Sequence, residues 1–222
     1  MRTFYTSDLH FNHVAILNYC QRPFKDVADM NEALIHNWNS VVAPGDEVYV
    51  IGDFALGDRS KIPEIRAKLN GKITLVAGNH DYKKSLKFFD AALHCLILEG
   101  PTALYMRHVP DFAFARDNPG CVVLCGHVHK SWRRLGNLIN VGADVWGYTP
   151  RTLEELMQAE DQSEDPAIKA EEDFRKNIWT MLEQGIDQKA ILATYANGGG
   201  ARSVDTIIRD FFLTKNPGKH IR

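Results

Sequence analysis

Between residues 72 and 81 the chain reads Lys72-Ile73-Thr74-Leu75-Val76-Ala77-Gly78-Asn79-His80-Asp81. The first six residues form a short apolar run with several β-branched side chains, which predicts a buried strand. Gly78 then allows a sharp turn, and the residues after it are of types that bind metals. Ligands of open α/β sheets gather beyond the carboxyl ends of the strands, so this stretch predicts a strand that leads into a site.

The same arrangement recurs through roughly the first 150 residues. Further short apolar runs cover Thr3 to Thr6, Glu47 to Ile51, Cys95 to Leu98, Ala103 to Met106, Cys121 to Leu124 and Leu138 to Val141. Helical patterns lie between them, the clearest from about Asp26 to Val42, with Asp26 as its N-cap. A shorter helix is predicted around Lys61 to Leu69. This alternation predicts an α/β domain in which helices cover the sheet faces.

Most of these runs end in metal-binding residue types. They lead into Asp8-Leu9-His10, Gly52-Asp53, Arg107-His108 and Gly126-His127-Val128-His129. If the backbone stays extended, the residues of each Asp-x-His or His-x-His pair point to the same side. Carboxylate, amide and imidazole groups without thiolate suit Mn²⁺, Fe or Zn²⁺. The set is too large for one tetrahedral ion, so it predicts two ions that share a carboxylate and orient a phosphate group.

Together and in this order, Asp8-x-His10, Gly52-Asp53, Gly78-Asn79-His80-Asp81, His108 and Gly126-His127-x-His129 resemble the calcineurin-like metallophosphoesterases. The resemblance is to the small bacterial or phage type and covers roughly the first 150 residues. It implies a sandwich of two mixed β-sheets flanked by helices, with the metals at one rim. A C-terminal helical appendage would follow this sandwich.

The resemblance also implies a role for each site residue. Asp8, His10 and His129 would hold the first metal. Asn79, His108 and His127 would hold the second, and Asp53 would bridge the two. His80 would protonate the leaving alkoxide after attack by a bridging hydroxide, and Asp81 would hold the His80 ring and raise its basicity.

The chain departs from the protein Ser/Thr phosphatases of this family. Their Gly-Asp turn ends in Asp-Arg-Gly, whereas this chain continues Gly52-Asp53-Phe54-Ala55 and carries Asp81 where they have glutamate. We therefore predict hydrolysis of a phosphodiester, with a nucleotide or cyclic nucleotide as a candidate substrate. Phosphomonoester or pyrophosphate hydrolysis is the alternative at the same site. The expected cofactors are two divalent ions, Mn²⁺ first, with Fe, Zn²⁺ or Ni²⁺ as alternatives.

Two residues are candidates for substrate binding. His13 follows Asp8-x-His10 closely, and either contacts phosphate at the rim of the site or begins the next helix. Arg22 precedes Pro23, and either makes a bidentate contact with phosphate or is a surface arginine before a turn.

The chain is expected to divide into a catalytic domain (1–152), an acidic linker or exposed helix (153–172) and a small C-terminal helical segment (173–222). Helices are predicted along the stripe that begins at Phe174, near Gln188 to Tyr195, and after a Ser203 cap, with a loop through Gly198-Gly199-Gly200. Positive charge near the end comes from Arg202, Arg209, Lys215, Lys219 and Arg222. This segment either packs against the catalytic domain or dimerises through Phe211 and Phe212, or it binds nucleic acid in a processing protein.

The composition and the sequence patterns limit which classes of partner and which location are expected. With 26 Lys and Arg against 28 Asp and Glu, the net charge of −2 indicates no general attraction to nucleic acid or to an anionic membrane. No apolar stretch approaches the roughly 20 residues of a membrane span, the N-terminus lacks a signal-peptide pattern, and the cysteines show no zinc-like pairing. We expect a cytoplasmic protein whose partner is a phosphate ester; its oligomeric state stays open.

Overall fold

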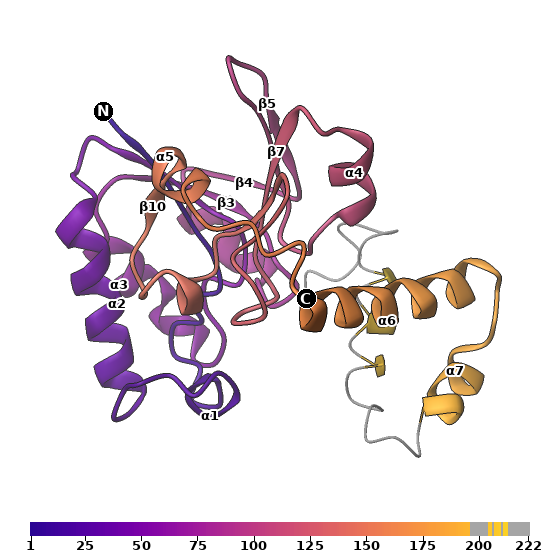
Figure 1. Cartoon of the computed structure of the whole chain (residues 1–222). Coiled ribbons are helices and arrows are strands. Elements are labelled where there is room, and N and C mark those ends of the chain that lie inside the picture. The colour runs from indigo at the N-terminus through magenta and orange to yellow at the C-terminus, as the bar shows by residue number, and fades with distance from the viewer. Residues whose placement is uncertain (196–203, 206, 210, 213–222) are drawn as a thin grey trace. The chain divides into compact units, whose positions relative to one another are not determined.

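The computed structural model describes residues 1–195, 204–205, 207–209 and 211–212, and Figure 1 shows the chain. The chain divides into two compact units, Met1–Asp161 and a second unit that begins at Gln162. None of the helices in the described ranges is long and apolar enough to cross a membrane.

The first unit contains two five-stranded sheets, each of mixed direction. The first sheet has the order β10 (Arg151–Thr152), β1 (Thr3–Thr6), β2 (Glu47–Val50), β3 (Lys72–Val76) and β4 (Ala91–Leu93). Strands β1 to β4 are parallel and β10 is antiparallel to β1. The second sheet has the order β5 (Leu96–Leu98), β6 (Ala103–Met106), β7 (Cys121–Cys125), β9 (Leu138–Asn140) and β8 (Arg134–Leu135). Its inner strands β6, β7 and β9 are parallel, and both edge strands are antiparallel to their neighbours.

The two faces of the first sheet are buried differently, because alternate side chains of a strand point to opposite faces. Phe4, Val48 and Leu75 pack in one core under α2 (Val27–Val41) and α3 (Ile62–Lys68). Tyr5 and Val76 instead join a second core with residues of β6, β7 and β9. The sheets therefore pack face to face with helices outside them, and α4 (Phe112–Asp117) contacts β7 (Figure 1). This confirms the predicted fold class.

The helices form where their caps and apolar spacing predict. Asp26 accepts hydrogen bonds from the backbone N–H groups of Ala28 and Asp29, and α2 buries Met30, Leu34 and Trp38 at intervals of one turn. Helix α3 has a proline in its first turn. A four-residue helix, α1 (Ile16–Tyr19), and the strands β4, β8 and β10 were not predicted. They are too short to carry a periodic pattern of their own.

The boundary after residue 152 differs from the prediction. Helix α5 (Leu153–Met157) begins with a capping box between Thr152 and Glu155, and its Leu156 is buried in the second core. These residues thus lie in the first unit, and of the two predictions for 153–172, linker or exposed helix, they form a helix, because one apolar side chain in an acidic stretch is enough to anchor a short helix. The assignment of catalysis to residues 1–152 stays a prediction.

The second unit is helical. Helix α6 (Pro166–Glu183) begins within the stretch predicted as an acidic linker or exposed helix, with Asp165 as its N-cap, and α7 spans Gln188–Tyr195. Ile178, Leu182 and Ile191 form a core with described residues beyond 203, among them Ile207 and Phe211. The predicted glycine loop, the Ser203 cap and the basic residues Arg202, Lys215, Lys219 and Arg222 lie outside the described residues. The alternatives for this segment therefore stay predictions.

Candidate metal centre

The candidate ligands lie on five loops that leave the carboxyl ends of β1, β2, β3, β6 and β7. The parallel strands bring these loops to the same edge, as the sequence predicted. Backbone hydrogen bonds join the loops: the Asp8 N–H donates to Gly52 O at 3.0 Å, and the His10 N–H donates to Asp53 O at 3.0 Å. The Gly126 N–H donates to His108 O at 2.9 Å. The site is thus built on a connected backbone framework.

The backbone of these loops is left-handed at most of the candidate ligands. Residues Asp8, His10, Asp53, His127 and His129 have φ values between 46° and 74°. The expectation that each pair shares a side because its backbone is extended is therefore wrong. Non-glycine residues with positive φ are uncommon, although Asp and His are among the more tolerant types. Such conformations persist where the surroundings dictate them, and they concentrate at functional sites.

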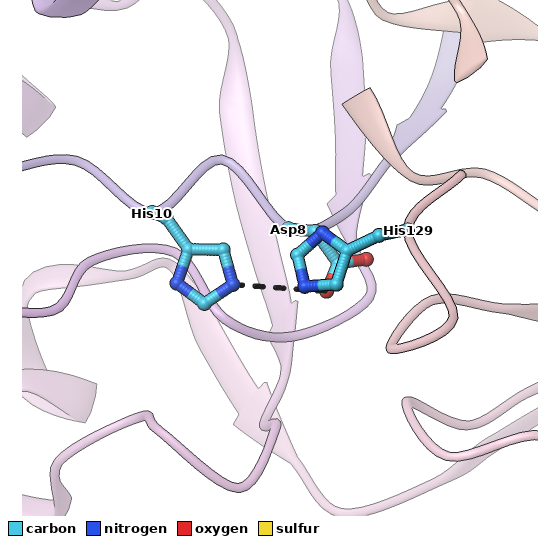
Figure 2. Close-up of side chains that lie close together, drawn as sticks. All are labelled: Asp8, His10 and His129. Atoms are coloured by element: carbon cyan, nitrogen blue, oxygen red, sulfur yellow. Dashed lines mark ion pairs between the residues drawn. The ribbon is translucent and has the colours of Figure 1, made fainter. Parts of the chain in front are cut away.

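Asp8, His10 and His129 form the first candidate ligand group (Figure 2). Asp8 Oδ1 lies 3.9 Å from His10 Nε2 and 4.0 Å from His129 Nε2. The His10 side chain is 2% exposed, and among the described residues neither of its ring nitrogens has a hydrogen-bond partner. Burying a polar nitrogen without a partner is costly, so a cation between Nε2 and Asp8 fits this arrangement. Burial lowers the pKa of His10 to about 3, which keeps the imidazole neutral, the form that binds metal.

Asp53 lies between this group and a second one. Its Oδ2 is 3.6 Å from His10 Nε2 and 3.3 Å from His108 Nε2. Asn79 Oδ1 is 3.1 Å from both His108 Nε2 and His127 Nδ1. The structure therefore brings all the predicted metal ligands together, with the Asp53 carboxylate at the centre.

Hydrogen bonds and charge prepare the second group for a cation. His108 Nδ1 lies 2.8 Å from Ile51 O, which makes Nδ1 the donor and directs Nε2 to Asp53. Burial alone would lower the pKa of His108, but the charge of Asp53 and its hydrogen bond outweigh burial and raise this pKa to about 10. Asp53 is held charged, with a pKa well below its usual value: burial opposes this, but the charge of His108 outweighs it. Buried carboxylates that hold a proton on a neighbouring imidazole can hold a metal ion in its place.

Asp144, in the short 3₁₀ helix Ala143–Val145, is a functional residue that the sequence did not single out. His129 Nδ1 lies 2.7 Å from Asp144 Oδ2, and this hydrogen bond leaves His129 Nε2 directed at Asp8. Metal-bound histidines usually donate their second nitrogen to a carboxylate in this way. The sequence could have indicated Asp144 by its position, because it follows the last predicted strand just as the candidate ligands follow their strands.

Arg22 is neither a surface residue nor free to bind phosphate, which corrects the prediction. Its side chain is 0% exposed. Its Nε and Nη2 donate to the two oxygens of Asp144 at 2.9 and 3.0 Å. Nη2 also donates to Asp8 O at 2.6 Å, and Nη1 donates to Leu9 O at 2.9 Å and to Met30 Sδ at 3.5 Å. All its donors are used to hold Asp144 and the backbone of Asp8 and Leu9.

Asp81 joins two of the loops that carry candidate ligands. Its Oδ2 accepts hydrogen bonds from the backbone N–H groups of Asp53 and Gly78, both at 2.8 Å, and its Oδ1 accepts one from Phe54 at 3.0 Å. Asp81 thus ties the two loops that carry Asp53 and Asn79, and its action on the His80 ring stays a prediction. Burial and the nearby negative charge of Asp53 raise its pKa to about 6.

His80 and His13 lie beside the candidate ligands, and both are partly exposed. The His80 side chain is 35% exposed, its Nε2 is 4.0 Å from Asp53 Oδ2, and its backbone N–H donates to Asp53 Oδ1 at 2.9 Å. The His13 ring lies 5.2 Å from the His10 ring, between centroids. Since α1 begins at Ile16, His13 belongs to the loop before the helix. Burial lowers the pKa of His13, and the charge of His80 lowers it further.

The motif glycines leave room for the ligands. A Cβ atom at Gly126 would clash with Ser7 Oγ and Asp8 Oδ2. At Gly52, where φ is +86°, it would clash with His108 Nδ1 and Gly78 Cα. The glycines are needed because ligand side chains occupy the space that a methyl group would fill.

Comparisons with known proteins find relatives in both sequence and structure. The chain is 35% identical over 171 residues to the uncharacterized protein MJ1445 of Methanocaldococcus jannaschii, which covers 71% of this chain and 91% of that protein. It is 32% identical over 82 residues to the Gene 66 protein of Mycobacterium phage L5, covering 36% of this chain and 39% of the phage protein. No protein-family model matches the chain.

Two solved structures are similar. The crystal structure of the protein of unknown function AQ665 from Aquifex aeolicus has a TM-score of 0.57 and 27% identity, covering 70% of this chain and 97% of that one. A conserved uncharacterized protein from Streptococcus pneumoniae TIGR4, described as a predicted phosphoesterase, has a TM-score of 0.33 and 19% identity over 63% of this chain and 70% of that one. At that TM-score the second similarity does not establish a shared fold.

Proposed function

We propose that this chain, which belongs to the same family as the M. jannaschii protein MJ1445, is a metal-dependent phosphoesterase that hydrolyses a phosphodiester. The observation that carries the proposal is the position of Asp53. Its Oδ2 lies within 4.0 Å of ring nitrogens of His10, His80 and His108. One carboxylate therefore adjoins both candidate ligand groups and the partly exposed His80.

The residues divide into two sets of ligands. Asp8, His10 and His129 would hold one divalent ion, and Asn79, His108 and His127 a second, with Asp53 shared. Mn²⁺ is proposed first, with Fe, Zn²⁺ or Ni²⁺ as alternatives, because the ligands are oxygen and imidazole nitrogen without thiolate. When bound, two such ions activate water and neutralise charge on the phosphoryl oxygens. A nucleotide or cyclic nucleotide substrate and a cytoplasmic location belong to this proposal and stay predictions.

His80 supports the proposal because it is the histidine beside Asp53 that reaches solvent. In the reaction, water supplies the oxygen that bonds to phosphorus, and the ester P–O bond breaks. The leaving alkoxide takes a proton, for which His80 is the proposed donor. His13 is proposed to contact a phosphate oxygen.

His80→Ala is expected to lower turnover by about 10²- to 10⁴-fold, the usual contribution of general acid catalysis. The loss should be largest for poor leaving groups, since a basic alkoxide needs the proton most. A series of aryl and alkyl diesters measures this, with metal content followed in parallel. His36→Ala, an exposed histidine of α2, is the control. An equal loss for all leaving groups would remove the acid role from His80.

Mn²⁺-dependent turnover of bis-p-nitrophenyl phosphate, compared with p-nitrophenyl phosphate, tests the function itself. We expect preference for the diester and complete loss of turnover with a chelator. Preference for the monoester would show the alternative phosphomonoesterase activity with the same metal chemistry. Absence of turnover of either substrate by a metal-loaded protein would contradict the proposed function.

A further inference from the structure

A basic segment follows His80 along the chain, and the proposed chemistry does not use it. The 3₁₀ helix η2 (Lys83–Phe88) follows Tyr82 directly, so that Lys83 is three residues from His80. Lys83, Lys84 and Lys87 are exposed, whereas Ser85 is buried and donates its hydroxyl to Tyr82 O at 2.6 Å. The segment is therefore anchored by its buried side while its lysines project into solvent.

A second stretch of chain adds a cation at the same place. The guanidinium of Arg59, in the 3₁₀ helix η1 (Arg59–Lys61), lies 4.5 Å from the centre of the Tyr82 ring. The backbone before Arg59 is fixed by the Asn12 side chain, which donates to Asp58 O at 3.1 Å. Stacking uses the face of the guanidinium and leaves its N–H donors for an anion. Within the described ranges, no ion pair is formed by Arg59, Lys83, Lys84 or Lys87.

An exposed aromatic residue lies beside His13. Tyr19 is 77% exposed, and its ring centre lies 6.3 Å from that of His13. The His13 ring lies in turn 5.2 Å from the His10 ring. Because most of the Tyr19 ring is exposed, packing against the protein does not account for its position.

We propose that these residues bind single-stranded nucleic acid and lead one of its phosphodiesters to the metal centre. We call them the rim: Tyr19, Arg59, Lys83, Lys84 and Lys87. The inference rests on the proposed function and names its substrate class. Proteins that bind single strands combine cations along the backbone with aromatic rings on which bases stack, and the rim offers both. From Lys83 to Lys87 a 3₁₀ helix rises by about 8 Å, which is enough to meet two successive phosphates of a strand rather than one. The local charge provides the attraction that the net charge of −2 does not.

The charge is tested by Lys83→Ala/Lys84→Ala in the full chain with Mn²⁺. The kcat/KM for a single-stranded oligonucleotide, divided by that for bis-p-nitrophenyl phosphate, should fall about tenfold or more. The slope of log affinity against log salt, from fluorescence anisotropy of the labelled strand, should become shallower by about 1.4, since each phosphate contact contributes about 0.7. The control is Lys68→Ala/Lys72→Ala, which removes the same charge near the start of β3, at the opposite end of the strand.

Base stacking is tested separately at Tyr19. Tyr19→Ala should weaken binding of the strand about tenfold, within the range of base–aromatic stacking, and Tyr19→Phe should retain it. A duplex of the same sequence should bind more weakly, because its bases are not free to stack on protein.

The outcomes separate this inference from the proposed function. If bis-p-nitrophenyl phosphate is cleaved but the strand is neither bound nor cleaved, or if the lysine variant behaves as its control, the inference is wrong and the function stands. If the strand is bound through Lys83 and Lys84 but no diester is cleaved, the rim stands and the hydrolase does not. Equal binding of duplex and single strand would overturn the assignment to single strands.

Discussion

Asp53→Asn is expected to abolish turnover and to release both metal ions together. Asp53 Oδ2 adjoins His10 and His108, which belong to different ligand groups, so its charge serves both sites. An amide retains an oxygen that can accept the hydrogen bond from the His80 backbone, and the loop should therefore keep its shape. The affinity for each ion should fall by more than the roughly 10- to 100-fold that loss of an outer hydrogen-bond partner costs.

Elemental analysis of the purified variant and titration with Mn²⁺ measure this effect directly. Asp46→Asn is a matched control: Asp46 precedes β2 where Asp53 follows it, and it accepts backbone hydrogen bonds from Arg2 and Ala43. The control should leave metal content unchanged. Loss of one ion only, or unchanged metal content, would contradict the shared position of Asp53.

Arg22→Ala is expected to lower the free energy of unfolding by about 3–5 kcal/mol, as removal of one partner of a buried ion pair does. The change removes both hydrogen bonds from Arg22 to Asp144, which keeps only its contact with His129, and it removes the guanidinium donor from the carbonyl groups of Asp8 and Leu9. It should also weaken metal binding, because Asp144 orients His129 and the Asp8 carbonyl belongs to a strained ligand residue. Arg22→Lys should restore little, since an ammonium cannot reproduce the planar fork.

Urea unfolding followed by tryptophan fluorescence measures the stability, with Trp38 buried in the first unit as a probe. Arg116→Ala removes an arginine whose ion pair with Asp117 is exposed, and it should leave stability close to that of the unaltered protein. If Arg22 bound phosphate instead, Arg22→Ala would raise KM for the diester while stability and metal content stayed unchanged. That result would contradict the structural role of Arg22.

Much of the fold was predictable because its signals are local. The apolar runs of β1, β3 and β6 and the Asp26 cap with the spacing of Met30, Leu34 and Trp38 each act within one element. The short strands β4, β8 and β10 were not predictable, because none of them contains an apolar β-branched residue such as Ile97 or Ile139, which mark the equally short β5 and β9. Leu156 shows the same limit in a helix, since burial of a single side chain depends on the core that receives it.

The sequence by itself determined which residue types follow which strands, and parallel strands bring such residues to one edge. Residue types at strand ends therefore predicted a metal site, and the resemblance to the metallophosphoesterases implied which residue serves which ion. Only the tertiary structure decided how they converge: a left-handed backbone at Asp8, Asp53 and His127, and support from side chains distant in sequence. Arg22 illustrates the reason. Whether a guanidinium meets phosphate or a buried carboxylate depends on Asp144, 122 residues away, and no local pattern records that contact.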